Sequence, residues 1–265
     1  MTRYTHGHHA TVLSSHQWRT AENSAAHLLP HLRPGTALLD VGCGPGTITA
    51  GLAGRVAPGR VTAVDSAAAV LAEAERTAAG QGLGNVEFAV ADVHALDFPD
   101  DSFDVVHAHQ VLQHLADPVQ ALREMRRVCR PGGIVAVREA DFGGMLWYPS
   151  PPGMDTWLPV YYKVARGNGG EPDAGRRLVS WARRSGFADV TASVSNWCYS
   201  TPEEREWWSE SWGGRMIHSS IAESAVSGGH ATRADLQRIH AGWKTWAAAD
   251  DGWFAVVHGE ILCRA

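Results

Sequence analysis

The sequence has little excess charge, few cysteines and no long apolar run. Its 265 residues carry a formal net charge of −5, which argues against a nucleic-acid partner because such proteins usually present a basic face. No apolar stretch approaches the ~20 residues of a membrane span, and no early segment has the charged and apolar parts of a signal peptide. We therefore expect a cytoplasmic protein with no membrane span and no nucleic-acid partner.

The four cysteines are scattered along the chain and form no C-x-x-C pair, so they indicate neither a disulfide framework nor a zinc site. Fourteen histidines are present, and His6, His8 and His9 lie close together. Imidazole is a common metal ligand, but a metal site also needs partner ligands at defined geometry. We expect no metal and interpret the early histidines as part of an N-terminal arm.

The most informative stretch is an apolar strand that ends in three alternating glycines, Asp40-Val41-Gly42-Cys43-Gly44-Pro45-Gly46. Glycine permits positive φ and lets a ligand approach the backbone without a Cβ in the way. A helix pattern follows at once, and a helix N-terminus attracts a carboxylate or phosphate. The motif predicts a small anionic or zwitterionic cofactor across this turn, bound at Gly42, Cys43 and Gly44.

Two details separate the candidate cofactors. The dinucleotide fingerprint G-x-G-x-x-G requires glycine where this chain has Thr47. Asp40, two residues before the first glycine, would repel a pyrophosphate but attract an ammonium group. Both details favour the methionine half of S-adenosylmethionine (SAM) over NAD. An NAD(P)-dependent oxidoreductase is the second hypothesis, and a SAM-binding protein without transferase activity is the third.

With these residues the chain resembles the class I SAM-dependent methyltransferases, and it is most similar to the ubiquinone/menaquinone-biosynthesis type. The resemblance extends over roughly residues 20 to 140, in the family's order and spacing. Its further motifs are Val64-Asp65, Ala91-Asp92-Val93, Phe103-Asp104-Val105-Val106, and Leu122-Arg123-Glu124 through Arg130-Pro131-Gly132-Gly133. It implies transfer of a methyl group from SAM to an O, N or C atom of a small-molecule acceptor by in-line displacement.

Short apolar runs alternate with helix patterns, which indicates an α/β domain with a mainly parallel sheet. We predict a Rossmann-like, mostly parallel seven-stranded sheet with helices on both faces and a helical cap inserted before the last strand. The strands are expected near 37–41, 61–65, 86–90, 103–108, 133–138, 188–197 and 253–263. Ser66 and Asp117 are predicted to cap helices.

The chain divides into five predicted parts. They are an arm over the cofactor (1–19), a SAM-binding core (20–142), a substrate loop with the end of the core (143–200), a helical cap (201–250) and the last core strand (251–265). The cap is expected because Thr201-Pro202-Glu203-Glu204 is a capping box and a second helix pattern starts at Thr232.

In an open parallel sheet, ligands bind beyond the carboxyl ends of the strands. This rule selects residues after the second, third and fourth strands, namely Asp65, Ser66, Asp92, Val93, His109, Gln110 and His114. The Asp65 carboxylate can accept both ribose hydroxyl protons, or it caps the next helix. Asp92 can accept from the adenine amine while Val93 packs on the ring, or Asp92 belongs to a loop that is simply acidic.

Methyl transfer from a sulfonium depends mainly on alignment and exclusion of water, because proximity alone can supply ~7–11 kcal/mol. A general base would be needed for a hydroxyl or an acidic carbon acceptor. His114 and Glu139 are the candidates. Their structural alternatives are a helix histidine bonded to backbone and a carboxylate paired with an arginine.

Ten of the eleven tryptophans lie beyond residue 140. We interpret this part of the chain as the pocket for an apolar or aromatic acceptor. The residues expected to line it are Trp147, Tyr148, Tyr162, Glu171 and Trp208. Trp207 and Trp208 are adjacent on a predicted helix and cannot both face one core. One of them should face a ligand, a partner or a second subunit, which would allow a homodimer.

The N-terminal arm is predicted to fold over SAM, with Tyr4 or His16 near the sulfonium and Arg19 near the methionine carboxylate. A disordered tail is the alternative. Deleting residues 1–15 should weaken SAM binding by about 2- to 30-fold, since an aromatic contact to a cation contributes ~0.5–2 kcal/mol. Calorimetric titration measures the change, and an unchanged affinity would contradict the arm.

Overall fold

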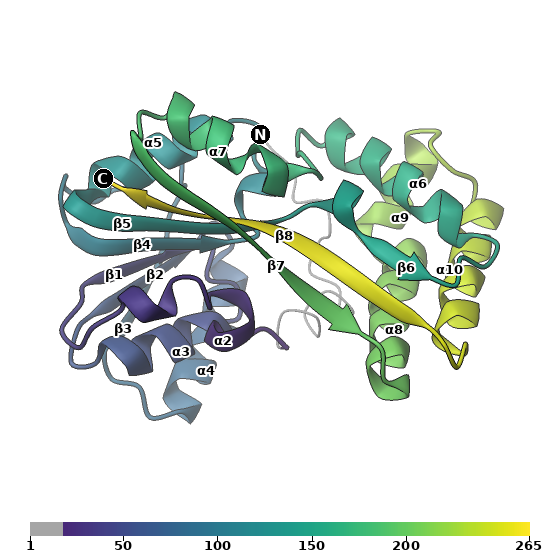
Figure 1. Ribbon diagram of the computed structural model, residues 1–265, viewed down its shortest axis with the longest axis horizontal. Coiled ribbons are helices and arrows are strands. Elements are labelled where there is room, and N and C mark those ends of the chain that lie inside the picture. The colour runs from purple at the N-terminus through teal and green to yellow at the C-terminus, as the bar shows by residue number, and fades with distance from the viewer. Residues whose placement is uncertain (1–17) are drawn as a thin grey trace.

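One eight-stranded sheet runs through the residues that the computed structural model describes, 18–265 (Figure 1). The strands are β1 (Leu38–Val41), β2 (Val61–Asp65), β3 (Val86–Val90), β4 (Phe103–His109), β5 (Cys129–Ala140), β6 (Leu146–Tyr148), β7 (Asp189–Tyr199) and β8 (Trp253–Arg264). Their order is β3-β2-β1-β4-β5-β8-β6, and β7 pairs with the other edge of β8. β1 to β5 are parallel, whereas β8 is antiparallel to each of its partners.

Helices cover both faces of the parallel part of the sheet. The helices are α2 (Ala21–Ser24), α3 (Thr47–Val56), α4 (Ala68–Gly80), α5 (Pro118–Val128), α6 (Met154–Gly167), α7 (Ala174–Arg184), α8 (Pro202–His218), α9 (Ser220–Ser227) and α10 (Arg233–Ala247). One face packs against α5 and α7 through a buried cluster that includes Leu39, Val106 and Val135. The other packs against α2 and α3 through Leu38 and Val105, because successive strand residues point to opposite faces.

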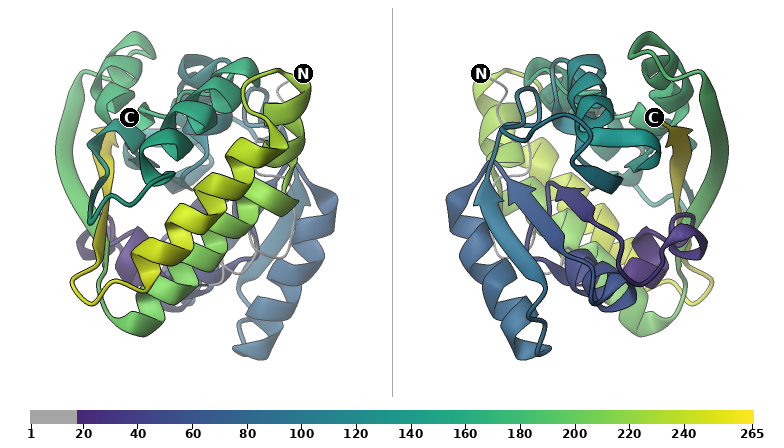
Figure 2. Two further views of the ribbon diagram at one scale, coloured as in Figure 1. Left: turned by 90° about the vertical axis from the view of Figure 1, so that its right-hand side faces the viewer. Right: turned by 90° about the vertical axis from the view of Figure 1, so that its left-hand side faces the viewer.

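The helices α6, α8, α9 and α10 form a separate group beside β6 and the adjoining ends of β7 and β8 (Figure 1). Figure 2 shows α8 and α10 lying side by side in this group. Its core is aromatic: the ring of Trp157 lies 4.8 Å from Trp212, 5.2 Å from Trp243 and 6.0 Å from Trp147, between ring centroids. These tryptophan side chains therefore pack in the core of the helical group.

The predicted α/β class, the mostly parallel sheet and the helical cap are confirmed, with two corrections. An eighth strand, β6, was missed because it has only three residues and depends on pairing with distant β8. The predicted Ser66 cap is wrong: Ala67 is the N-cap of α4, and the Asp65 carboxylate accepts the Ala67 N–H. The predicted capping box begins α8 at Thr201, and α10 begins after Thr232 as predicted, also with a capping box.

Asp117 caps α5 as predicted, accepting a hydrogen bond from the Gln120 N–H, with Pro118 at the first helical position.

Among residues 18–265, no helix combines the length and the apolar character that crossing a membrane requires.

Strand β8 joins the parallel part of the sheet to the group of helices beside β6. Its residues 258–264 pair with β5, and residues 253–255 pair with β6. Helix α7 packs closely on β8 at Gly175 and Gly259. A Cβ on Gly259 would lie only 2.2 Å from the Gly175 carbonyl oxygen, so this approach requires glycine.

Replacing Gly259 with Ala should lower the free energy of unfolding by about 1–3 kcal/mol, because an added methyl group cannot fit without backbone shifts. Urea unfolding measures the change. Gly54→Ala is the control: Gly54 is exposed in α3, and no described atom lies within 4 Å of its Cβ position. That variant should be as stable as the wild type or more so. Equal losses in both variants would contradict the steric explanation.

Candidate functional site

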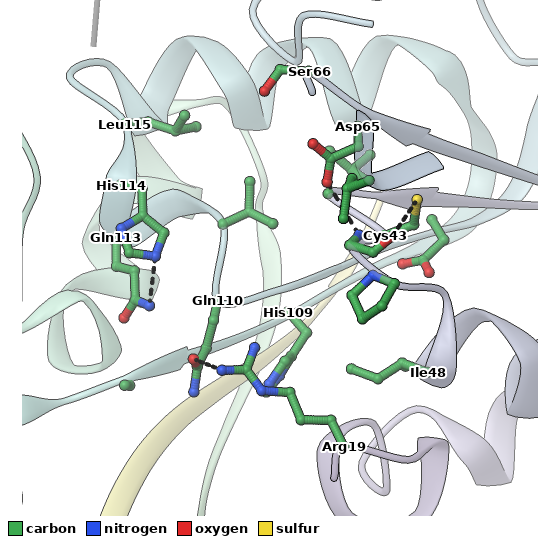
Figure 3. Close-up of a pocket in the computed structure, with 18 of the residues that line it drawn as sticks. Arg19, Cys43, Ile48, Asp65, Ser66, His109, Gln110, Gln113, His114 and Leu115 are labelled. Atoms are coloured by element: carbon green, nitrogen blue, oxygen red, sulfur yellow. Dashed lines mark hydrogen bonds between the residues drawn. The ribbon is translucent and has the colours of Figure 1, made fainter. Parts of the chain in front are cut away.

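A cavity of about 680 Å³ lies at the carboxyl ends of β1, β2, β3 and β4. Part of its lining comes from the segments that follow these strands, and part comes from β7 and α8 (Figure 3 shows its strand-end half). This is the edge where an open α/β sheet binds ligands. The cavity therefore brings the predicted cofactor residues together with the aromatic half of the chain.

The three glycines of the β1 turn have different roles, although all have positive φ. A Cβ on Gly42 would lie 2.4 Å from Val111 Cγ2, and one on Gly46 would lie 2.9 Å from Ala74 Cβ. These two positions allow tight packing of the turn. At Gly44 (φ +54°) no described atom lies within 4 Å of the Cβ position. Gly44 is thus the position where a ligand can approach the backbone.

Asp65 lies beside Gly44 in the cavity wall. Its Oδ2 accepts a hydrogen bond from the Gly44 N–H at 3.1 Å, and its Oδ1 accepts one from the Ala67 N–H at 3.0 Å. The carboxylate therefore connects the ends of β1 and β2. Each oxygen retains capacity for a further donor.

Asp92, Val93 and Ser66 also line the cavity. The Asp92 side chain is 70% exposed, and its Oδ1 accepts a hydrogen bond from the His94 N–H at 2.9 Å. That backbone hydrogen bond, followed by the His94 side chain, lowers the pKa of Asp92, so the group is ionised at neutral pH. Val93 is buried and gives this side of the cavity an apolar surface.

Asp40 reaches the cavity with its carboxylate already held on two sides. Thr49 Oγ1 donates to Oδ2 at 2.5 Å, and His107 Nδ1 lies 2.8 Å from Oδ1. The register of β1 on β4 places Asp40 directly opposite His107. Sequence reasoning missed this histidine, because only the strand pairing shows that the two residues meet.

Arg19 lines the cavity, and Figure 3 shows its hydrogen bond to Gln110, the first in a chain. Its Nη2 donates to Gln110 Oε1 at 2.9 Å, and Gln110 Nε2 lies 2.9 Å from His258 Nε2. His258 Nδ1 lies 3.0 Å from the Val256 carbonyl oxygen, to which it must donate. This fixes the neutral tautomer that accepts from Gln110, and burial lowers the pKa of His258 well below its ordinary value. No motif marks His258 in the sequence.

Gln110 follows β4 in the left-handed region, at φ +54°, which is uncommon for a residue with a side chain. His109, the last residue of β4, is buried and lines the cavity. Burial, followed by the charge of Arg138, lowers the pKa of His109 well below its ordinary value. A neutral imidazole therefore faces this part of the cavity.

The two predicted general bases differ. His114 ends the short 3-10 helix η2 (Leu112–His114) and lines the cavity. Burial lowers its pKa to about 3, so its imidazole is neutral at pH 7 and is a weak base. Glu139 does not line the cavity. Its carboxylate instead accepts the backbone N–H groups of residues 111, 112 and 113 at 2.9, 2.7 and 3.2 Å. The expectation of a catalytic Glu139 is corrected: this carboxylate holds the turn after β4.

Four of the five predicted acceptor-pocket residues do not line the cavity. Trp147 stacks on Phe254 of β8 at 5.6 Å, and Tyr148 is 56% exposed on β6. The Tyr162 hydroxyl donates to Asp173, and Glu171 pairs with two arginines. The error arose because strand pairing and α6 packing direct these side chains elsewhere.

Trp208 does line the cavity, as predicted. The other lining residues from beyond residue 140 are Phe142, Met145, Trp197, Tyr199, Trp212, Arg215 and Val256. Trp208, Trp212 and Arg215 follow the i, i+4, i+7 spacing of one helix face, which is the signal that could have identified them. Trp207 is not part of the lining. Its ring lies 5.7 Å from that of Trp18 and 5.8 Å from that of Trp208, so only one of the two adjacent tryptophans lines the cavity although their rings are neighbours.

Tyr4 and His16 lie outside the described residues. Within residues 18–265, no group of three His, Cys, Asp or Glu side chains is arranged to hold a metal ion.

Comparison with known proteins agrees with this geometry. A family model described as a methyltransferase domain matches residues 39–137. An uncharacterised methyltransferase of Schizosaccharomyces pombe is 33% identical and aligns over 98% of this chain and 96% of that protein. A ubiquinone/menaquinone biosynthesis C-methyltransferase of Hahella chejuensis is 41% identical over 41% of this chain and 44% of its own length.

Among solved structures, a [4+2]-cyclase named SpnF is similar, with 25% identity and a TM-score of 0.56. The alignment covers 94% of this chain and 80% of that one. The likeness therefore extends beyond the parallel core into the helical group.

The structural role of Glu139 predicts a particular pH dependence. Burial raises its pKa from 4.5 to about 7, against the effect of its three backbone hydrogen bonds. The stability that this group contributes is therefore complete below pH 4.5 and is lost as the pH rises toward 7. The unfolding free energy of wild type minus that of Glu139→Gln should fall by on the order of 3 kcal/mol across this range.

Urea unfolding at several pH values measures this difference. Glu124→Gln is the control, because the Arg127 side chain lowers the pKa of Glu124. The unfolding free energy of wild type minus that of Glu124→Gln should therefore rise with pH. A Glu139 difference that is flat or rises with pH would contradict the prediction.

Proposed function

Because the chain belongs to the class I SAM-dependent methyltransferases, we propose that this cavity holds SAM at the β1 turn and a small apolar or aromatic acceptor against α8. The observation that carries the proposal is the shared cavity. It joins an open glycine position beside Asp65 to a wall of aromatic side chains. A donor and an acceptor molecule could therefore meet within one cavity.

For the cofactor, the proposed roles follow from position. The Asp65 carboxylate would accept the two ribose hydroxyls, and the glycine turn would pass next to the ligand at Gly44. Val93 would pack on the adenine, with Asp92 accepting from its amine. Arg19, oriented by Gln110, would bind the methionine carboxylate. Asp40 would attract the ammonium group.

SAM supplies an electrophilic methyl group. The chain's own residues would mainly align the acceptor and exclude water, as Trp197, Tyr199 and Trp208 are buried in the lining. Burial lowers the pKa values of His109 and His114 in the lining, so these imidazoles are weak bases that suit hydrogen bonding to the acceptor more than removal of a strongly held proton. Alignment therefore supplies most of the proposed rate enhancement.

Calorimetric titration with S-adenosylhomocysteine (SAH), in parallel with NADH, tests the cofactor. The wild type should bind SAH and not NADH. Asp65→Ala should weaken SAH binding by about 10-fold or more, since hydrogen bonds to a charged group contribute ~1.5–3 kcal/mol.

Asp97→Ala is the matched control, because Asp97 is an exposed carboxylate outside the cavity lining. Its SAH affinity should equal that of the wild type. Binding of NADH alone would refute the proposal. Tight SAH binding without methyl transfer to any acceptor in a broad screen would favour a SAM-binding protein of another activity.

A further inference from the structure

We propose that the acceptor carries a carboxylate, which Arg215 binds in the aromatic half of the cavity with Tyr199 and Trp208 as neutral donors. This inference rests on the proposed function, because it assigns the chemistry of the second molecule in the same cavity. It goes further by predicting the charge of the acceptor.

The first support is the separation of charge within the described lining. Its acidic residues, Asp40, Asp65 and Asp92, lie at or just beyond the carboxyl ends of β1, β2 and β3. Its basic residues with permanent charge are Arg19 and Arg215. Arg19 is oriented by Gln110 at the end of β4, whereas Arg215 comes from α8 on the aromatic side. The aromatic half therefore contains a cation and no carboxylate among its described lining residues.

The second support is the way α8 presents Arg215. Trp208, Trp212 and Arg215 lie on one face of this helix, at i, i+4 and i+7. The Arg215 guanidinium carbon lies 4.9 Å from the Trp212 ring centroid, a cation–π geometry that orients the planar group. Arg215 is only 5% exposed, and it lines the cavity. An oriented, desolvated guanidinium matches the planar, two-oxygen geometry of a carboxylate.

Arg205 shows the contrasting use of an arginine on the same helix. Its side chain donates to the carbonyl oxygens of Ser200, Ala247 and Gly252. It does not line the cavity. Arg205 therefore stabilises the junction of α8 with α10 and β8. Arg215, ten residues later, belongs to the cavity lining.

The third support comes from two neutral donors beside Arg215. Tyr199 and Trp208 belong to the cavity lining, and neither the Tyr199 hydroxyl nor Trp208 Nε1 has a hydrogen-bond partner among the described residues. Both side chains are more than nine-tenths buried, with 1% and 5% exposure. Their rings stack at 4.4 Å. Leaving such groups unsatisfied is costly, and an indole N–H can only donate, so a ligand oxygen is the complementary group.

Electrostatics places Arg215 near the same residues. Burial raises the pKa of Tyr199 and lowers that of His114, and in both cases the charges of Arg19 and Arg215 act to lower the pKa. The field of the two arginines thus extends over this part of the cavity. It would favour an anion there and disfavour a cationic acceptor.

Binding of matched acids and amides to the SAH-saturated protein tests the proposal. The probes are 2-naphthoate against 2-naphthamide and decanoate against decanamide, titrated by calorimetry. In the wild type, at least one acid should bind about 10-fold or more tightly than its amide. Arg215→Gln should abolish this preference, and Arg215→Lys should retain part of it, while both keep wild-type SAH affinity.

Arg233→Gln, which removes an exposed charge at the start of α10, is the control and should keep the full preference. Wild-type SAH affinity in each variant shows that the fold and the cofactor site are intact, so failure of the proposed function would be seen separately as loss of SAH binding. Equal binding of acids and amides, tighter binding of the amides, or no acid binding at millimolar concentration would overturn the carboxylate assignment. An acid preference that persists in Arg215→Gln would also overturn it.

Discussion

The site depends on one buried carboxylate that lies outside it. Glu139 accepts three successive backbone N–H groups and so fixes the turn after β4. The side chain of Val111 in that turn touches the position of Gly42, which sets the path of the glycine turn. The Gln113 carbonyl accepts the Glu171 N–H at 2.9 Å, which attaches the loop between α6 and α7. The residue expected to be a general base from its strand-end position instead supports the turn after β4 and, through Val111, the glycine turn.

The cofactor half of the site could be predicted because its signals are local. The glycine turn, Asp65 and the helix caps can each be identified from a few neighbouring residues, and the strands before them are mainly apolar. The rule that ligands bind at strand ends then brings them together without knowledge of long-range contacts. Only the Ser66 cap failed there, because Asp65 one residue earlier took over the backbone contact.

The acceptor half could not be predicted in the same way. Whether an aromatic side chain lines a cavity or fills a core depends on how α6, α8 and α10 pack, and composition alone does not contain that information. Trp147 and Trp208 illustrate this, since one stacks on Phe254 and the other faces the cavity. His258 is equally hidden, 148 residues from the Gln110 side chain that it orients. The homodimer and the roles of Tyr4 and His16 stay predictions.

The bridging position of β8 also has a consequence for how the protein is made. Every other strand precedes β8 in the chain, yet β5, β6 and β7 all pair with it. While the ribosome is still synthesising this segment, β7 and β6 have no edge to join, and the wall formed by Trp197 and Tyr199 has no fixed place. The parallel core can begin to form early, but a nascent chain cannot assemble the cavity until its last described strand has emerged.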